Sequence, residues 1–185
     1  MAEGSDRSGM VIGYGWVPGV VGEIVRAHAV YYAREWDFGP VFEAKVAGGL
    51  AAFLERYDPA RDRLVHAHDG DTFLGSVVID GSDPELAPGG THLRWFVVTD
   101  AARGRGLGRR LMDEAVGFLQ SSGAASCYLD TFAGLDAARH LYESCGFRLT
   151  EEREATSWGT PVAEQRFVLD VDASAAGAAP SLTCG

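Results

Sequence analysis

The chain has 185 residues, of which 46% are hydrophobic and 23% charged, and its formal net charge is −10. These values are typical of one globular domain with a sizeable core. Because an acidic surface repels a polyanion, they disfavour a nucleic-acid partner.

The sequence has no signal of a membrane segment or a disulfide framework. No apolar run reaches the roughly 18 residues of a spanning helix, and the first residues lack both the basic and the apolar region of a signal peptide. Cys127, Cys145 and Cys184 are odd in number and unclustered. We therefore expect free thiols, no metal site, no membrane contact and a cytoplasmic location.

The two ends of the chain differ in composition from the rest. Residues 1–9 are small and polar, and residues 172–185 are rich in Ala, Gly and Ser. Neither segment can bury enough apolar area to offset its ordering entropy. We predict flexible tails on both sides of a domain formed by residues 10–171.

The first third of that domain predicts one strand and two helices. Residues 10–14 form a short apolar segment, and from residue 20 to residue 36 apolar side chains recur mostly at helical spacing. The same spacing continues after Pro40 up to Tyr57, where Asp58 and Pro59 end it.

The middle predicts an antiparallel meander and then a helix. Two strand-like runs at 63–80 flank the turn signal Asp69-Gly70-Asp71, and residues 91–98 form a third. From Leu107 onward, apolar residues at spacing four form a helical stripe that ends near Gly123.

The last third adds a strand at 126–132, a helix that Gly146 ends, and a final hairpin with its turn near Gly159 and Thr160. The expected fold class is α/β (α+β), with a mixed central β-sheet of six to seven strands flanked by about four helices.

A basic, glycine-rich stretch, ARGRGLGRRL at 102–111, lies between an expected strand and an expected helix. A turn there presents free backbone N–H groups and the positive end of the helix dipole, which together bind phosphate. The glycines permit close approach of an anion, and Arg103, Arg105 and Arg109 can add charge-assisted contacts.

Two nucleotide motifs fit the stretch poorly. No lysine follows a glycine as a P-loop requires, and the G-x-G-x-x-G register fails because Arg109 stands where the third glycine should be. Asp130, about 20 residues on, is the one feature that favours a dinucleotide site.

The segment RGRGLG resembles the R/Q-x-x-G-x-G/A motif of the GCN5-related N-acetyltransferase (GNAT) superfamily. The strand WFVV before it, the helix LGRRLMDEAVGFL after it and ARHLYESCGF at 138–147 resemble the family's flanking motifs in order and spacing. The likeness covers about residues 10–171. More narrowly, the chain resembles the acetyltransferase half of MarR-type regulator/acetyltransferase fusions, without their DNA-binding half.

This resemblance implies the GNAT fold and acetyl-CoA as cosubstrate. The loop backbone would hold the pyrophosphate, and the strand before it would hydrogen-bond the pantetheine arm. The implied cofactor-binding residues are Phe96, Val97, Val98, Arg103, Gly104, Arg105, Gly106, Leu107, Gly108 and Arg109.

The resemblance also implies direct attack of a primary amine on the thioester through a tetrahedral intermediate. Tyr142 would be the general acid that protonates the departing thiolate, because a phenol is protonated at neutral pH. The alternative for Tyr142 is packing on the apolar face of its helix.

The sequence does not identify the general base. Many family members have a Glu on the strand before the loop, but this strand reads His92-Leu93-Arg94-Trp95. His92, the pair Glu35 and Asp37, and a water relay are the candidates. Glu35 lies between the two early helices, in the region that usually shapes the acceptor site, and solvated helix-end charge is its alternative.

The expected acceptor is a small-molecule amine, and the six residues Trp16, Tyr31, Tyr32, Trp36, Trp95 and Trp158 favour an apolar or aromatic one. A protein lysine or N-terminus is the second choice. An acyl-CoA-binding regulatory module without turnover is a rival, and a nicotinamide-dependent oxidoreductase is a distant third. A homodimer is an expectation from the family.

Overall fold

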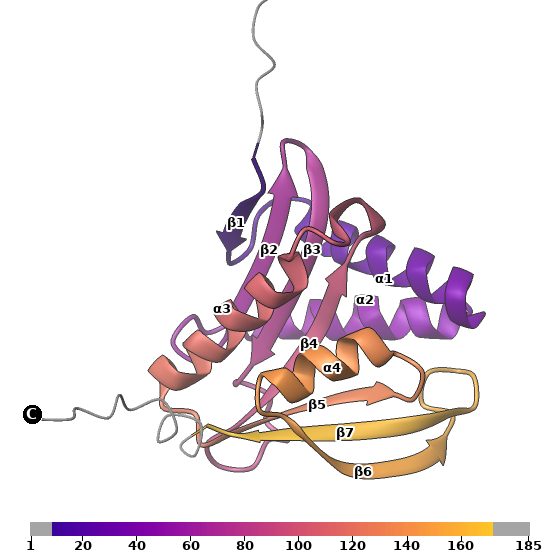
Figure 1. Ribbon diagram of the computed structural model, residues 1–185. Helices are drawn as coiled ribbons and strands as arrows, with labels where there is room; N and C mark the ends of the chain where they lie inside the picture. The colour runs from indigo at the N-terminus through magenta and orange to yellow at the C-terminus, as the bar shows by residue number, and fades with distance from the viewer. Residues whose placement is uncertain (1–8, 172–185) are drawn as a thin grey trace, which may run out of the picture.

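The computed structural model describes residues 9–171. It contains one seven-stranded sheet with helices on both faces (Figure 1). The strands are β1 (Val11–Tyr14), β2 (Arg63–Asp69), β3 (Thr72–Asp80), β4 (Gly90–Val98), β5 (Ser126–Phe132), β6 (Arg148–Ala155) and β7 (Val162–Asp170). The helices are α1 (Val20–Trp36), α2 (Pro40–Glu55), α3 (Leu107–Ser122) and α4 (Asp136–Ser144), with a 3-10 turn at Asp100–Ala102.

Every strand and helix expected from the sequence is confirmed within a few residues. Local signals explain most boundaries: Pro40 begins α2, and Gly123, in the left-handed conformation, ends α3. The tails expected at 1–9 and 172–185 lie, apart from residue 9, outside the described residues, as does Cys184. Cys127 and Cys145 are free thiols.

The sheet order is β1-β2-β3-β4-β5-β7-β6, and β4 with β5 is its one parallel pair. Parallel neighbours need a crossover connection, which α3 supplies. The three strands β2, β3 and β4 form the expected antiparallel meander. The parallel pair therefore divides the meander from the C-terminal β5-β7-β6 group.

That parallel pair is short. Three residues of β4 pair with β5, from Gly90 opposite Ser126 to His92 opposite Tyr128, although both strands continue. Beyond His92 the strands separate, and the ribbon shows β4 and β5 running apart toward their carboxyl ends (Figure 1). The side of β4 that faces β5 therefore carries backbone groups without a strand partner from Leu93 to Val98.

A β-bulge lies in the unpaired part of β4. Ser76 pairs with Val97 and Val78 pairs with Arg94, so β4 has one residue more than β3 between these points. Trp95 has a φ of 47°, which is rare for a bulky side chain, and its carbonyl accepts a buried hydrogen bond from Ser76 Oγ at 3.0 Å.

Two apolar clusters lie on the two faces of the sheet. On one face, α3 and α4 pack on the sheet through residues such as Leu111 and Tyr142; on the other, α1 and α2 pack through residues such as Ile24 and Phe53. No helix among residues 9–171 is long and apolar enough to cross a bilayer.

Candidate functional site

The glycine-rich loop lies at the N-terminus of α3, as expected. Gly104 and Gly106 have φ values of 71° and 75°, in the left-handed region that glycine adopts without strain. A Cβ at either position would meet no atom within 4 Å. The loop therefore presents its backbone to open space, beside the N–H groups of the first helical turn, which have no partner within the helix.

The three arginines of the loop are not free charges in this structure. Arg103 pairs with Asp100 at 3.0 Å, Arg105 with Asp69 at 3.0 Å, and Arg109 with Asp113 at 2.8 Å. All these arginine side chains are largely exposed, and exposed pairs contribute little free energy, so an anion of higher charge can replace the carboxylates at small cost.

The loop leads directly to the separated edge of β4. A Cβ at Gly108 would lie 3.6 Å from the ring of Phe96 and 3.4 Å from Leu141. Phe96 in turn contacts the ring of Tyr142 on α4, with centroids 5.9 Å apart. The start of α3, the free edge of β4 and α4 thus form one continuous surface.

A cavity of about 620 Å³ opens where β4 and β5 separate. Both strands line it, together with α1, α2, Tyr142 of α4 and the β6-β7 hairpin. This volume is in the usual range of small-molecule sites. Phe96 lines this cavity, whereas Val97 and Val98 line a second cavity of about 360 Å³ between α1 and the adjoining ends of β3 and β4.

Tyr142 is a buried wall residue of the large cavity. Its ring packs among Phe96, Phe147 and Phe167. Burial raises the pKa of the Tyr142 hydroxyl above its ordinary value, so the group is protonated at neutral pH. The side chain therefore packs in the core and also lines the cavity. Its role as general acid stays a prediction.

His92 also lines the cavity, at the point where the two strands part. Its ring stacks on Tyr128 with centroids 4.1 Å apart, and Nε2 lies 4.0 Å from Asp130 Oδ2. Burial, followed by the nearby Arg94 charge, lowers the pKa of His92 to about 4. The imidazole is consequently neutral at pH 7.

Asp130 and Thr131, which end β5, line the cavity as well. Asp130 accepts two hydrogen bonds from Arg166 of β7, at 2.8 and 2.9 Å, and both residues lie on the cavity wall. This carboxylate is therefore already held by a bidentate ion pair.

Glu35 lies outside both cavities. Its carboxylate is exposed at the end of α1 and accepts a hydrogen bond from Arg34 at 2.6 Å. Of the six aromatic residues that suggested an aromatic acceptor, three line the large cavity: Tyr32, Trp95 and Trp158. Tyr31 lines the smaller cavity, Trp36 packs on Phe132, and Trp16 is exposed.

Sequence reasoning missed a second histidine at the cavity. His28 is buried on α1, and its Nδ1 donates to the Ile24 carbonyl at 2.8 Å, which leaves Nε2 as the acceptor of the neutral ring. Burial lowers the pKa of His28 to about 4. Its position within an apolar helical stripe carried no signal of a site.

Sequence reasoning also missed the cations of the cavity wall, which are Lys45, Arg94, Arg153 and Arg166. These residues come from three different elements, α2, β4 and the β6-β7 hairpin, and no local motif joins them. Within residues 9–171 no group of three or more His, Cys, Asp or Glu side chains is placed to hold a metal ion.

Comparison with known proteins agrees with this geometry. The model of the "Acetyltransferase (GNAT) family" matches residues 23–147. An uncharacterised N-acetyltransferase from Schizosaccharomyces pombe is 31% identical over 121 residues, which are 65% of this chain and 72% of the relative.

Two solved structures show the same fold. YncA of Salmonella typhimurium, solved with acetyl-CoA, aligns with a TM-score of 0.69 at 16% identity, covering 96% of this chain and 100% of its own. A chimeric spermidine N-acetyltransferase from Vibrio cholerae aligns with a TM-score of 0.63 at 14% identity, covering 89% of this chain and 99% of its own. With its glycine loop, separated central strands and family match, the chain belongs to the GNAT acetyltransferase family.

Proposed function

We propose that this protein is an N-acetyltransferase that moves an acetyl group from acetyl-CoA to a primary amine of a small molecule by direct attack. One observation carries the proposal. A glycine-rich loop at a helix N-terminus, an unpaired strand edge and a buried phenol form one surface that ends in a cavity. The narrower likeness to MarR-type fusions rests on sequence motifs alone.

The residues present suit a CoA thioester. The open backbone at Gly104 and Gly106 and the free N–H groups of the first turn of α3 would hold the diphosphate. The unpaired edge of β4 offers backbone donors and acceptors to the amide groups of the pantetheine arm. When bound there, acetyl-CoA supplies an activated acyl group.

Tyr142 is the proton donor in this proposal. A buried phenol with a raised pKa stays protonated until a stronger base is next to it, and a departing thiolate is such a base. Its ring is held by three phenylalanine rings, and within residues 9–171 its hydroxyl has no hydrogen bond to another side chain, so the hydroxyl can turn to the sulfur.

His92 receives the proton from the amine, through water, in this proposal. The neutral ring can accept a proton at pH 7, but a pKa of about 4 makes it a weak base. A water molecule between the amine and the ring would take the amine proton and pass one of its own to the ring. The imidazolium formed, with a pKa of about 4, would then release its proton to solvent.

The test is a calorimetric titration with acetyl-CoA followed by thiol release with a panel of small amines. We expect saturable binding and acceptor-dependent release of CoA. Absence of acetyl-CoA binding would refute the proposal. Tight binding without any acceptor-dependent thiol would instead support the regulatory module, which the lack of a carboxylate on β4 favours.

A further inference from the structure

The bulge in β4 turns two successive side chains to the same face of the sheet. Arg94 and Trp95 both lie against Gly49 of α2, where a Cβ would be 3.2 Å from Arg94 Nη2 and 2.9 Å from the Trp95 ring. In a regular strand, neighbours point to opposite faces. The bulge therefore places a guanidinium on the cavity wall, stacked on the Trp95 ring with its carbon 4.2 Å from the ring centre.

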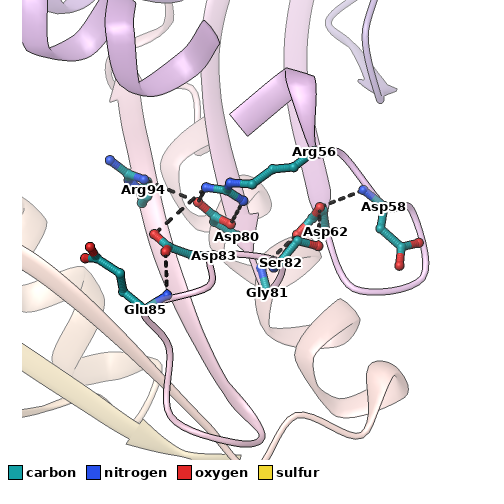
Figure 2. A network of polar contacts seen from close by, with 9 residues as sticks. All are labelled: Arg56, Asp58, Asp62, Asp80, Gly81, Ser82, Asp83, Glu85 and Arg94. Atoms are coloured by element: carbon teal, nitrogen blue, oxygen red, sulfur yellow. Dashed lines mark hydrogen bonds and ion pairs between the residues drawn. The ribbon is translucent and has the colours of Figure 1, made fainter. Parts of the chain in front are cut away.

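The charge of this guanidinium is only partly balanced. The buried carboxylate of Asp80 accepts hydrogen bonds from both Nη atoms of Arg56 at 2.6 Å each, and a single one from Arg94 Nη1 at 3.2 Å. Figure 2 shows the two arginines reaching Asp80 from different sides, and Asp83 Oδ2 lies 3.9 Å from Arg56 Nη2. Two cations thus share one carboxylate, and the more weakly bound one faces the cavity.

A second cation stands on the same wall. Lys45 lies one helical turn before Gly49, so the two positions share a face of α2. Lys45 lines the cavity, and its Nζ donates to the backbone carbonyl of Ser157, a neutral acceptor. Neither the Lys45 charge nor the larger share of the Arg94 charge is cancelled by a carboxylate of the cavity lining.

The acidic side chains of the lining come from β5, β6 and β7. Asp130 is held by Arg166, and Glu164 accepts hydrogen bonds from the Ser157 N–H at 3.0 Å and from Arg153 at 3.5 Å. Glu151 is the third acid. The C-terminal strands thus carry acids together with the cations Arg153 and Arg166, whereas the only charged residues that α2 and β4 contribute to the lining are Lys45 and Arg94.

From this distribution, and resting on the proposed function, we infer that the acceptor amine also carries a carboxylate, which Arg94 and Lys45 bind. Arg94 is the specificity-determining residue, because its planar fork matches a carboxylate and is held in place by Trp95 and Asp80. The acids of the C-terminal strands can attract the ammonium end of the same molecule. A polyamine, which has no anionic group, would meet like charge at Lys45 and Arg94.

Matched ligand pairs test the inference. Calorimetry with CoA-saturated protein would compare phenylalanine, methionine and glutamine with their carboxamides, and steady-state thiol release would use the same pairs. We expect the free acids to bind and react better than their carboxamides by about tenfold or more. Equal affinity for acids and carboxamides, or a preference for spermidine, would overturn the inference whether or not turnover occurs.

Arg94→Gln should remove most of this preference by weakening the acids and leaving the carboxamides nearly unchanged. Arg94→Lys, which keeps the charge and loses the fork, should recover part of it, and Lys45→Gln should lower it independently. Arg148→Gln is the matched control, because Arg148 is exposed on β6 and pairs with Asp170 away from the cavity. Asp80 keeps its two bonds to Arg56 in every variant, and circular dichroism would verify folding.

The outcomes separate the two proposals. Turnover of neutral amines with no effect of Arg94→Gln refutes the carboxylate site and leaves the acetyltransferase intact. A carboxylate preference in calorimetry that Arg94→Gln removes, without acetyl transfer, supports the site and refutes the proposed activity.

Discussion

The two buried histidines make a quantitative prediction about acid stability. His28 and His92 have pKa values of about 4 in the folded chain, because burial disfavours their charged forms, whereas an unfolded chain protonates them near pH 6.5. Between these values the unfolded state binds more protons than the folded state. Stability is therefore complete above about pH 6.5, falls as the pH drops, and stops falling from this cause below pH 4.

The size of the effect follows from these pKa values. At pH 5 each histidine lowers the free energy of unfolding by about 2 kcal/mol relative to pH 8, and the two together lower it by about 4 kcal/mol. This is a large share of the roughly 5–15 kcal/mol by which a typical domain is stable. With a urea slope of about 2 kcal/mol/M, the unfolding midpoint should drop by about 2 M. Burial also lowers the pKa of His66, so this residue adds to the loss of stability at low pH.

Urea unfolding followed by tryptophan fluorescence at pH 8 and pH 5 measures this loss. Asp80 has a lowered pKa and loses its charge only at more acidic pH, so it does not contribute to the loss of stability between pH 8 and pH 5. His28→Leu should abolish about half of the pH dependence, and an exposed-site control, His140→Leu, should leave it unchanged. A midpoint equal at both pH values would refute the burial argument.

Three further predictions concern the loop, the phenol and the buried carboxylate. Gly106→Val should raise the dissociation constant of acetyl-CoA about tenfold, because a branched side chain is strained at a φ of 75° and obstructs the loop. Calorimetry measures this dissociation constant, and Gly117→Ala, farther along α3, is the control. Tyr142→Phe should lower kcat by roughly 10 to 10³ at similar cofactor affinity, and an unchanged kcat would restrict Tyr142 to packing. Asp80→Ala should destabilise the chain by about 3–5 kcal/mol in urea unfolding, because it removes the buried carboxylate that Arg56 and Arg94 share and leaves only Asp83, 3.9 Å from Arg56; a loss under 1 kcal/mol would contradict the network.

The sequence alone was sufficient to predict the helices and strands and the position of the glycine-rich loop. Helical spacing, Pro40 and Gly123 act on neighbouring residues, so they could be read without knowing the fold, and α1, α2 and α3 lie where they were expected. The glycines of 102–111 likewise set their own backbone conformation, and the loop precedes α3 as predicted.

Tertiary structure decided everything that joins distant segments. The parting of β4 from β5 depends on a register between strands that α3 separates in sequence, and the bulge at Trp95 depends on pairing with β3. The alternation of β4 would place Arg94 and Trp95 on opposite faces, and Glu35, which the family pattern placed near the acceptor, is exposed outside the cavities. Arg94 and Lys45 line one cavity only because α2 packs over the bulged strand at Gly49, about 45 residues away in sequence, and no local pattern encodes that contact.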